Sequence, residues 1–204
     1  MLKDIQADVR EKVDVVRQTN KIALAKFLIP FGLAGATVIF FKLFMPEMLG
    51  KYATVFGIYS FVPIIGTVTV VPTGLGLGIH PIPLIAFIVY TDAILAMFLV
   101  WNFDYAKKIP GFGQLVERVG ERGEQALQKY KWAKRLGFIG VVMFVIFPLQ
   151  WTGAGVGSIV GRLIGMESLM TWLAVIIGTC IRSVILVYAS WLFAFIFNLF
   201  LVAH

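Results

Sequence analysis

The sequence predicts an all-α integral membrane protein. We expect an inverted repeat of a re-entrant helical hairpin plus a transmembrane helix, with an extra N-terminal transmembrane helix. Hydrophobic residues make up 59% of the 204 residues, whereas a soluble domain has about 45–50% apolar residues. Charged residues make up 14%, against about 25% in a soluble domain. Most charges fall within 1–26 and 104–135, and a glycine pattern occurs twice. This composition excludes a soluble globular enzyme, a disordered chain and a nucleic-acid-binding module.

Four stretches are apolar enough to lie in a bilayer, whose hydrocarbon core of about 30 Å is spanned by about 20 apolar helical residues. They are 27–45, 52–103, 136–164 and 168–203. The second and third stretches are interrupted by prolines and glycines, and the fourth is long enough for one helix or two. Hydropathy alone therefore leaves the number of crossings open.

The distribution of Lys and Arg indicates which segments face the cytoplasm. Residues 1–26 hold six of these residues and 104–135 hold eight, whereas the connector 42–51 holds two. The positive-inside rule places both rich segments in the cytoplasm, so an even number of crossings lies between them. We expect 27–45 and 82–103 to be these crossings, in a multi-pass protein of the plasma membrane with a cytoplasmic N-terminus.

The same argument divides the chain into four parts. Residues 1–26 form a cytoplasmic amphipathic segment, either on the membrane surface or packed on the protein's own loops. Residues 27–103 hold the first transmembrane helix and the first hairpin-plus-helix repeat. Residues 104–135 form a cytoplasmic amphipathic linker, and 136–204 hold the second repeat, whose last helix we expect to cross once.

Two apolar segments are predicted to enter and leave the membrane on one side. Residues 52–71 lie between the two crossings and must return to the outer side, and Pro63 favours a turn there. The run 136–148, about 13 residues long, is too short to span comfortably. Non-helical backbone at membrane depth is tolerated only where protein or water satisfies it, so two such hairpins imply a polar interior.

A T-G-x-G-x-G pattern occurs at 73–78 and again at 152–157. The first copy is predicted to enter from outside and the second from the cytoplasm, as in the inverted repeats of many secondary transporters. Glycines at the end of a half-helix expose backbone groups that can face a substrate or a coupling ion. The alternative is that these glycines only let helices pack closely. The candidate pathway residues from the two segments are Thr73, Gly74, Gly76, Gln150, Thr152, Gly153 and Gly155.

Two charges lie inside the predicted membrane helices. Asp92 and Arg182 stand within apolar runs, and at about 1.5 Å of rise per residue their depths agree to about 5 Å. We therefore predict an Asp92–Arg182 pair, in which Asp92 is a protonatable switch and Arg182 tunes it or holds an anionic substrate group. The alternative is a purely structural ion pair. Arg162 is a further pathway candidate, with extension towards the cytoplasmic interface as its alternative.

The segment 137–166, GFIGVVMFVIFPLQWTGAGVGSIVGRLIGM, resembles the proline-threonine-glycine re-entrant segment of the small multidrug export family. That family is similar to the DedA/VTT superfamily, whose members are described as inverted repeats with two re-entrant hairpins. The likeness covers roughly residues 50–190 and is most specific at Pro148 and the second glycine pattern. It implies proton-dependent movement of lipids or lipid-linked phosphates, or export of small molecules. The acidic and arginine signatures of the DedA hairpins are absent, so Asp92 and Arg182 remain as the charges for coupling.

The resulting functional hypothesis is a DedA-like, proton-coupled membrane transporter of a lipid-linked or small amphipathic or anionic substrate. A small multidrug exporter and a non-transporting assembly or scaffold protein are the alternatives. An enzyme is not expected, because the sequence has no His/Glu metal cluster and no convincing nucleophile–base set. We expect no cofactor and no metal. The expected partners are membrane lipids, the substrate and protons, without nucleic acid, and a homo-oligomer stays open.

Overall fold

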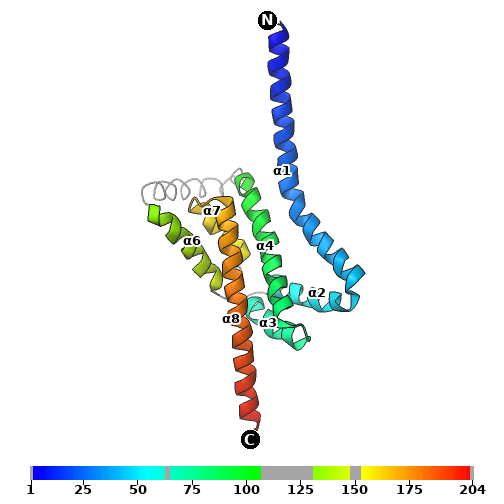
Figure 1. Cartoon of the computed structure of the whole chain (residues 1–204), viewed down its shortest axis with the longest axis vertical. Helices are drawn as coiled ribbons and strands as arrows, with labels where there is room; N and C mark the ends of the chain where they lie inside the picture. The colour runs from blue at the N-terminus through cyan, green and yellow to red at the C-terminus, as the bar shows by residue number, and fades with distance from the viewer. Residues whose placement is uncertain (1, 63–64, 107–130, 148–152, 203–204) are drawn as a thin grey trace.

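The computed structural model describes residues 2–62, 65–106, 131–147 and 153–202. These residues form helices and no strand (Figure 1). The helices are α1 (Leu2–Phe44), α2 (Pro46–Phe61), α3 (Gly66–Gly76), α4 (Pro81–Ala106), α6 (Lys131–Ile146), α7 (Ala154–Leu163) and α8 (Ser168–Val202).

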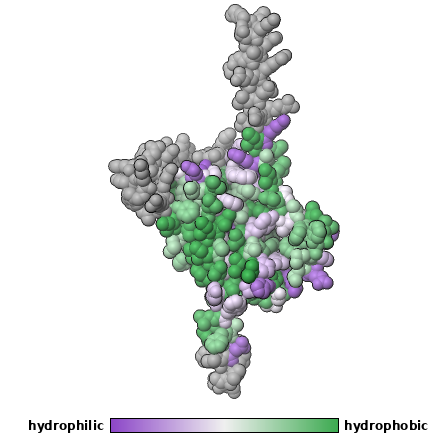
Figure 2. All heavy atoms as spheres, viewed as in Figure 1, coloured by the Kyte–Doolittle hydropathy of each residue, from purple (hydrophilic) through white to green (hydrophobic). Residues whose placement is uncertain are grey.

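Three helices are long and apolar enough to cross a membrane. The candidate spans among the described residues are Lys21–Phe44 in α1, Pro81–Phe103 in α4 and Ser168–Ile196 in α8. Figure 2 shows hydrophobic side chains over most of the middle of the bundle on the face in view. The all-helical membrane class is thereby confirmed. Residues 168–202 form one continuous helix, so this stretch does not fold into two helices.

The other four helices are too short to cross alone. The helices α2 and α6 have 16 residues each, α3 has 11 and α7 has 10, against about 20 for a span. The order short, short, long therefore occurs twice, as α2–α3–α4 and as α6–α7–α8. The pair α2–α3 lies where α4 begins, and the pair α6–α7 lies at the opposite end, where α8 begins (Figure 1).

The C-terminal ends of α3 and α7 are built alike. Gly78 follows α3 with φ 75°, and Gly165 follows α7 with φ 80°, a left-handed conformation that glycine adopts at little cost. In each turn the next amide donates back to a helix carbonyl, that of Gly74 at 3.1 Å or that of Gly161 at 3.0 Å. This is the hydrogen bonding of a Schellman cap. The two caps stand 87 residues apart.

The spacing of 87 residues also relates the contacts between the short helices and the long helices that follow them. A Cβ atom on Gly74 would lie 2.6 Å from Leu84 Cδ1, and one on Gly161 would lie 2.5 Å from Thr171 Cγ2. Leu84 and Thr171 are again 87 residues apart. Glycine at these two places lets a short helix touch the long helix that follows it, which is the packing role.

The two glycine patterns therefore lie at different ends of their helices, and the predicted equivalence of 73–78 and 152–157 is wrong. The first copy ends α3, whereas Gly153 of the second copy is the N-cap of α7. A spacing of 87 residues pairs 73–78 with 160–165 instead of 152–157. Small residues recur wherever membrane helices pack closely. Two segments at different places in the fold can therefore share a six-residue glycine pattern.

The helix α1 runs without a break from Leu2 to Phe44, so the predicted N-terminal segment continues directly into the first span. It is joined to α4 by polar contacts: Thr37 Oγ1 and the Tyr90 hydroxyl lie 2.7 Å apart, and Asn102 donates to the carbonyl of Lys26 at 3.4 Å. Most of the predicted linker, residues 107–130, lies outside the described residues.

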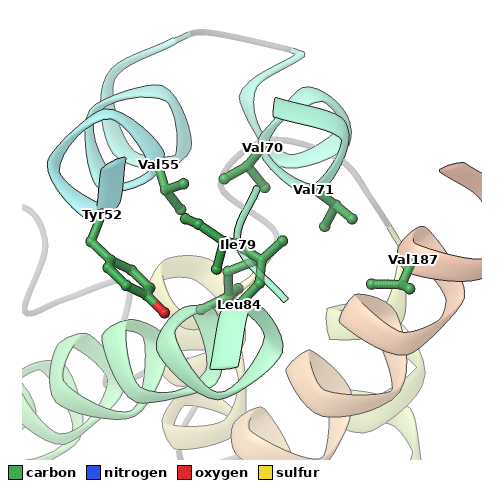
Figure 3. Close-up of a cluster of buried hydrophobic side chains, with 8 residues drawn as sticks. Tyr52, Val55, Val70, Val71, Ile79, Leu84 and Val187 are labelled. Atoms are coloured by element: carbon green, nitrogen blue, oxygen red, sulfur yellow. The ribbon is translucent and has the colours of Figure 1, made fainter. Parts of the chain in front are cut away.

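Two clusters of buried apolar side chains form the core. The first joins α2, α3, the start of α4 and α8, as Figure 3 shows. Its buried members are Tyr52, Val55, Val70, Val71, Ile79, Leu84, Ile88 and Val187. The second joins α4, α6, α7 and the first half of α8, through Ala96, Val141, Val145, Ala154, Met166, Ala174 and Val175.

Candidate functional site

The predicted ion pair is present. A guanidinium nitrogen of Arg182, Nη2, lies 2.9 Å from Asp92 Oδ2, and the two side chains are only 2% and 3% exposed. Asp92 belongs to α4 and Arg182 to α8, so the pair ties these two long helices together. The depth argument from the sequence is confirmed for this contact.

The pair lies between the two apolar clusters. On α4, Asp92 falls between Ile88 of the first cluster and Ala96 of the second. On α8, Arg182 falls between Val175 of the second cluster and Val187 of the first. Apolar packing on both sides excludes solvent from the pair, so its charges must be satisfied by protein groups.

The carboxylate of Asp92 accepts hydrogen bonds on both oxygens. Oδ2 accepts from Thr179 Oγ1 at 2.7 Å as well as from Arg182. Oδ1 accepts from the hydroxyl of Tyr59 at 2.7 Å. Three donors, one of them cationic, therefore bind the carboxylate.

The guanidinium of Arg182 binds more than the carboxylate. Its Nη2 also donates to the Tyr59 hydroxyl oxygen at 2.6 Å, and Nη1 donates to the carbonyl of Val145 at 3.2 Å. Val145 lies in the last turn of α6, where carbonyls lack a partner within the helix and a positive charge is favoured. We call Tyr59, Asp92, Thr179, Arg182 and the Val145 carbonyl the buried polar cluster.

The N-cap of α7 also lies against this cluster. A Cβ atom on Gly153 would stand 2.8 Å from Arg182 Nη1, so a larger residue there would require the guanidinium to shift. Through Tyr59, Val145 and Gly153, both pairs of short helices therefore meet at the ion pair that joins the long ones.

Chemically, the arrangement joins one carboxylate, that of Asp92, to one guanidinium, that of Arg182, in a single buried pair. Arginine stays protonated in proteins, so Arg182 is a fixed positive charge. Removing one member of a buried pair leaves the other uncompensated and costs about 3–5 kcal/mol. Among the described residues, no three His, Cys, Asp or Glu side chains gather as a metal site requires.

The remaining predicted pathway residues are not brought to the cluster by the structure. Thr73, Gly74 and Gly76 end α3, where Gly74 packs on Leu84, eight residues or about 12 Å before Asp92 on α4. Gly155 lies in the first turn of α7 with open space around its Cα. Gln150 and Thr152 lie outside the described residues. Only Gly153 of the glycine patterns is seen to contact Arg182.

Arg162 lies at the far end of α7. Its Nη1 donates to the carbonyl of Met166 at 2.7 Å, and its guanidinium carbon stands 5.4 Å from the centre of the Phe103 ring. Phe103 follows Asp92 by 11 residues on α4, a rise of about 16 Å. The structure thus shows Arg162 in the last turn of α7 and not at the buried polar cluster.

Two residues of the cluster were missed from the sequence. Thr179 precedes Arg182 by three residues, so it shares a helix face with Arg182, and this spacing could have identified it. Tyr59 carries a weaker signal, because it stands in an apolar run without a charge nearby. A tyrosine that is buried in such a run usually finds a partner for its hydroxyl, but the sequence does not say which.

The comparison with protein families finds a match over the part of the chain that holds most of the buried polar cluster. Residues 67–185, from α3 to the middle of α8, match the family described as "Putative small multi-drug export protein". The matched region includes Asp92, Thr179 and Arg182, whereas Tyr59 precedes it. No curated protein and no solved structure is significantly similar to the chain. Because the match covers more than half of the chain, this protein belongs to the small multidrug export family.

Proposed function

We propose that this protein is a proton-coupled transporter of the plasma membrane that moves an anionic amphipathic substrate, such as a lipid-linked phosphate, past Asp92 and Arg182. The observation that carries the proposal is the buried Asp92–Arg182 pair, which both pairs of short helices contact. A purely structural role would not require the one buried acid among the side chains whose burial is described to stand where α2, α4, α6 and α8 meet.

The proposed architecture is an inverted repeat of two re-entrant hairpins. The helices α2–α3 would enter from the outer side and α6–α7 from the cytoplasmic side, with the N-terminus in the cytoplasm. Their short lengths, their places at opposite ends of the bundle and the spacing of 87 residues support this arrangement (Figure 1). A site where two broken helices meet is typical of secondary transporters.

The proposed coupling follows from the fixed charge of Arg182. Once Asp92 takes up a proton, Arg182 lacks its counter-ion and favours an anionic substrate group. Proton binding and anion binding then strengthen each other, because binding linkage is reciprocal. The substrate and the proton would therefore cross in the same direction.

The transport experiment uses the full chain in proteoliposomes with an imposed pH gradient and a fluorescent short-chain lipid phosphate as probe. The wild-type protein is expected to move the probe from the acidic to the alkaline side. Asp92→Asn removes the effect of the gradient, whereas Glu47→Gln, which changes an exposed acid at the start of α2, retains it. Equal gradient-driven movement in Asp92→Asn would refute the coupling role.

The topology is tested by cysteine labelling in a Cys180→Ser background, because Cys180 is exposed. Cysteines at Glu47 and His80 flank α2–α3, and both should react with an impermeant reagent from outside. Cysteines at Lys21 and Glu167 should react only from the cytoplasmic side. Reaction of Glu47→Cys and His80→Cys from opposite sides would mean that α2–α3 crosses the membrane.

Export of a cationic amphiphile is the second candidate, favoured by the family description. A cation would compete with the proton for Asp92, so it would move against the proton. The fixed Arg182 charge, 2.9 Å from Asp92, opposes this candidate because it repels a cation. The same vesicles with ethidium as probe distinguish the two candidate functions. Ethidium movement towards the acidic side supports the exporter. Lipid phosphate movement towards the alkaline side supports the first proposal.

A further inference from the structure

Ser158 lies in the second turn of α7, and its hydroxyl is buried without a partner. The residue is 1% exposed, and its Oγ makes no hydrogen bond within the described part of the chain. We propose that Ser158 is a binding group for the anionic head of the substrate, in the seam between α4 and α7. The inference rests on the proposed function in one respect, that the substrate is an anion. It adds a second binding site, which lies before Arg182.

A hydroxyl in a helix ordinarily donates to the carbonyl four residues earlier in its own helix. Six hydroxyls among the described residues do so at 2.7–3.0 Å, those of Thr37, Thr54, Thr69, Thr91, Thr171 and Ser190. Ser158 makes no such bond to the carbonyl of Ala154. A buried hydroxyl without a partner is unfavourable, and alanine at this position would avoid the cost. The hydroxyl therefore indicates a ligand from outside α7.

The side of α7 that carries Ser158 packs on α4. Arg162 follows Ser158 by four residues, so the two share a helix face, and the Arg162 guanidinium lies over the ring of Phe103 in α4. Gly153, which faces Arg182 of α8, precedes Ser158 by five residues, a rotation of about 140° around the helix. Ser158 therefore belongs to the seam between α4 and α7.

The wall of α4 along this seam is apolar. Ala96, Val100 and Phe103 recur at the spacing of one helix face and are 0–3% exposed. Ala96 belongs to the same buried cluster as Ala154, one turn before Ser158 on α7. A hydroxyl that faces an apolar wall suits an amphipathic molecule. Its hydrocarbon part would lie along α4, and its head would accept a hydrogen bond from Ser158.

The place of Ser158 along α7 fits an intermediate position on a path. In the proposed topology the C-terminal end of α7 lies towards the cytoplasm. The contact of Gly153 with Arg182 is about 7.5 Å further along the helix from Ser158. An anion that enters from the cytoplasmic end therefore reaches the hydroxyl before it reaches the guanidinium. A neutral hydroxyl binds an anion more weakly than a guanidinium does, so the head can pass on to Arg182.

The seam is closed in this structure and must part to admit the head group. On its other side α7 is held closely to α8, because a Cβ atom on Gly161 would lie 2.5 Å from Thr171 Cγ2. The contact with α4 is therefore the one expected to open. The hydroxyl without a partner makes the closed seam less favourable, and a bound anion would remove this cost.

The first experiment compares stability with transport. Ser158→Ala removes a hydroxyl that bonds no protein group, so its unfolding midpoint in micelles should equal or exceed that of the wild type. Its KM for the fluorescent lipid phosphate in proteoliposomes should rise about tenfold, as expected for the loss of one hydrogen bond to a charged group. Ser190→Ala is the matched control, because Ser190 donates within α8 at 2.7 Å, and it should keep the wild-type KM. An unchanged KM in Ser158→Ala would overturn the inference, and so would a lowered unfolding midpoint.

The second experiment measures binding without a pH gradient. Ser158→Cys, in a Cys180→Ser background of the full chain in vesicles, is labelled with a small methanethiosulfonate from the cytoplasmic side. Short-chain phosphatidic acid should slow the labelling, whereas diacylglycerol with the same chains should not. Ala174→Cys, which is 0% exposed on α8, is the control and should stay unlabelled. Absence of labelling at Ser158→Cys, or labelling that phosphatidic acid does not slow, would overturn the inference.

Inorganic phosphate identifies the source of the anion. Slower labelling of Ser158→Cys with inorganic phosphate as well as with phosphatidic acid supports a site for phosphate groups in general. Slower labelling with phosphatidic acid alone supports a site for a lipid-linked phosphate. Slower labelling with ethidium instead of either phosphate would overturn the inference, because a hydroxyl that donates to an anion does not select a cation.

The proposed function fails separately. If Asp92→Asn retains gradient-driven transport while phosphatidic acid slows the labelling of Ser158→Cys, the coupling role of Asp92 fails and the site at Ser158 stands. If the wild-type protein moves the lipid phosphate and Ser158→Ala moves it with the same KM, the site at Ser158 fails and the proposed function stands.

Discussion

Thr179 stands at the place on α8 that Asp92 occupies on α4, and the two side chains are hydrogen-bonded to each other at 2.7 Å. They are separated by 87 residues, the spacing that also relates Gly78 to Gly165 and Leu84 to Thr171. The buried polar cluster therefore lies where the two halves of the chain meet. One half supplies an acid at this place and the other supplies a hydroxyl, so the site is chemically asymmetric although its framework repeats.

Arg182→Gln is expected to lower the free energy of unfolding by about 3–5 kcal/mol, because Asp92 would be left charged and buried without its partner. Combining it with Asp92→Asn should recover most of this loss, since no uncompensated charge remains. Denaturant unfolding in micelles measures both. A single variant within about 0.5 kcal/mol of wild type would contradict the burial of the pair.

Gly153→Ala is expected to lower stability by about 1–3 kcal/mol and to reduce gradient-driven transport, because the added methyl group would stand 2.8 Å from Arg182 Nη1. Gly155→Ala is the matched control, since its Cβ meets open space on the same helix. It should be neutral or slightly stabilising, as alanine favours a helix over glycine. Unfolding and probe flux are compared for the two variants. Equal effects would argue against a specific contact with Arg182.

Gly178→Ala should force α6 away from α8, because a Cβ atom there would lie 3.0 Å from the Val142 carbonyl, which cannot move without its helix. The Val145 carbonyl would move with it and lose its bond to Arg182. We expect a loss of about 1–3 kcal/mol or more in the same unfolding assay. Gly140→Ala on α6, whose Cβ meets nothing within 4 Å, is the control and should remain close to wild type.

The variant Arg162→Gln distinguishes the role of Arg162 from that of Arg182. Arg162 binds the Met166 carbonyl at the turn after α7 and lies over the ring of Phe103, which stands about 16 Å along α4 from Asp92. The variant should therefore keep the pH dependence of transport, even if the loss of the cap lowers stability. The measurement is probe flux at several pH gradients, normalised to the amount of folded protein. A changed pH dependence would place Arg162 on the pathway after all.

The sequence by itself determined the membrane class, the three long apolar helices and the contact between Asp92 and Arg182. These depend on local quantities: twenty or so apolar residues span a bilayer, and a fixed rise per residue converts position into depth. Two charges at equal depth in an apolar medium have few other partners, which made the pair predictable.

Only the tertiary structure decided the different surroundings of the two glycine patterns and the contacts of Tyr59. Gly74 and Gly153 have the same sequence signature, but one touches Leu84 and the other a guanidinium. Which side chain a glycine faces depends on how helices from distant parts of the chain pack. Tyr59 likewise reaches Asp92 across 33 residues and Arg182 across 123, and no local pattern records a hydrogen bond that forms only when three helices meet.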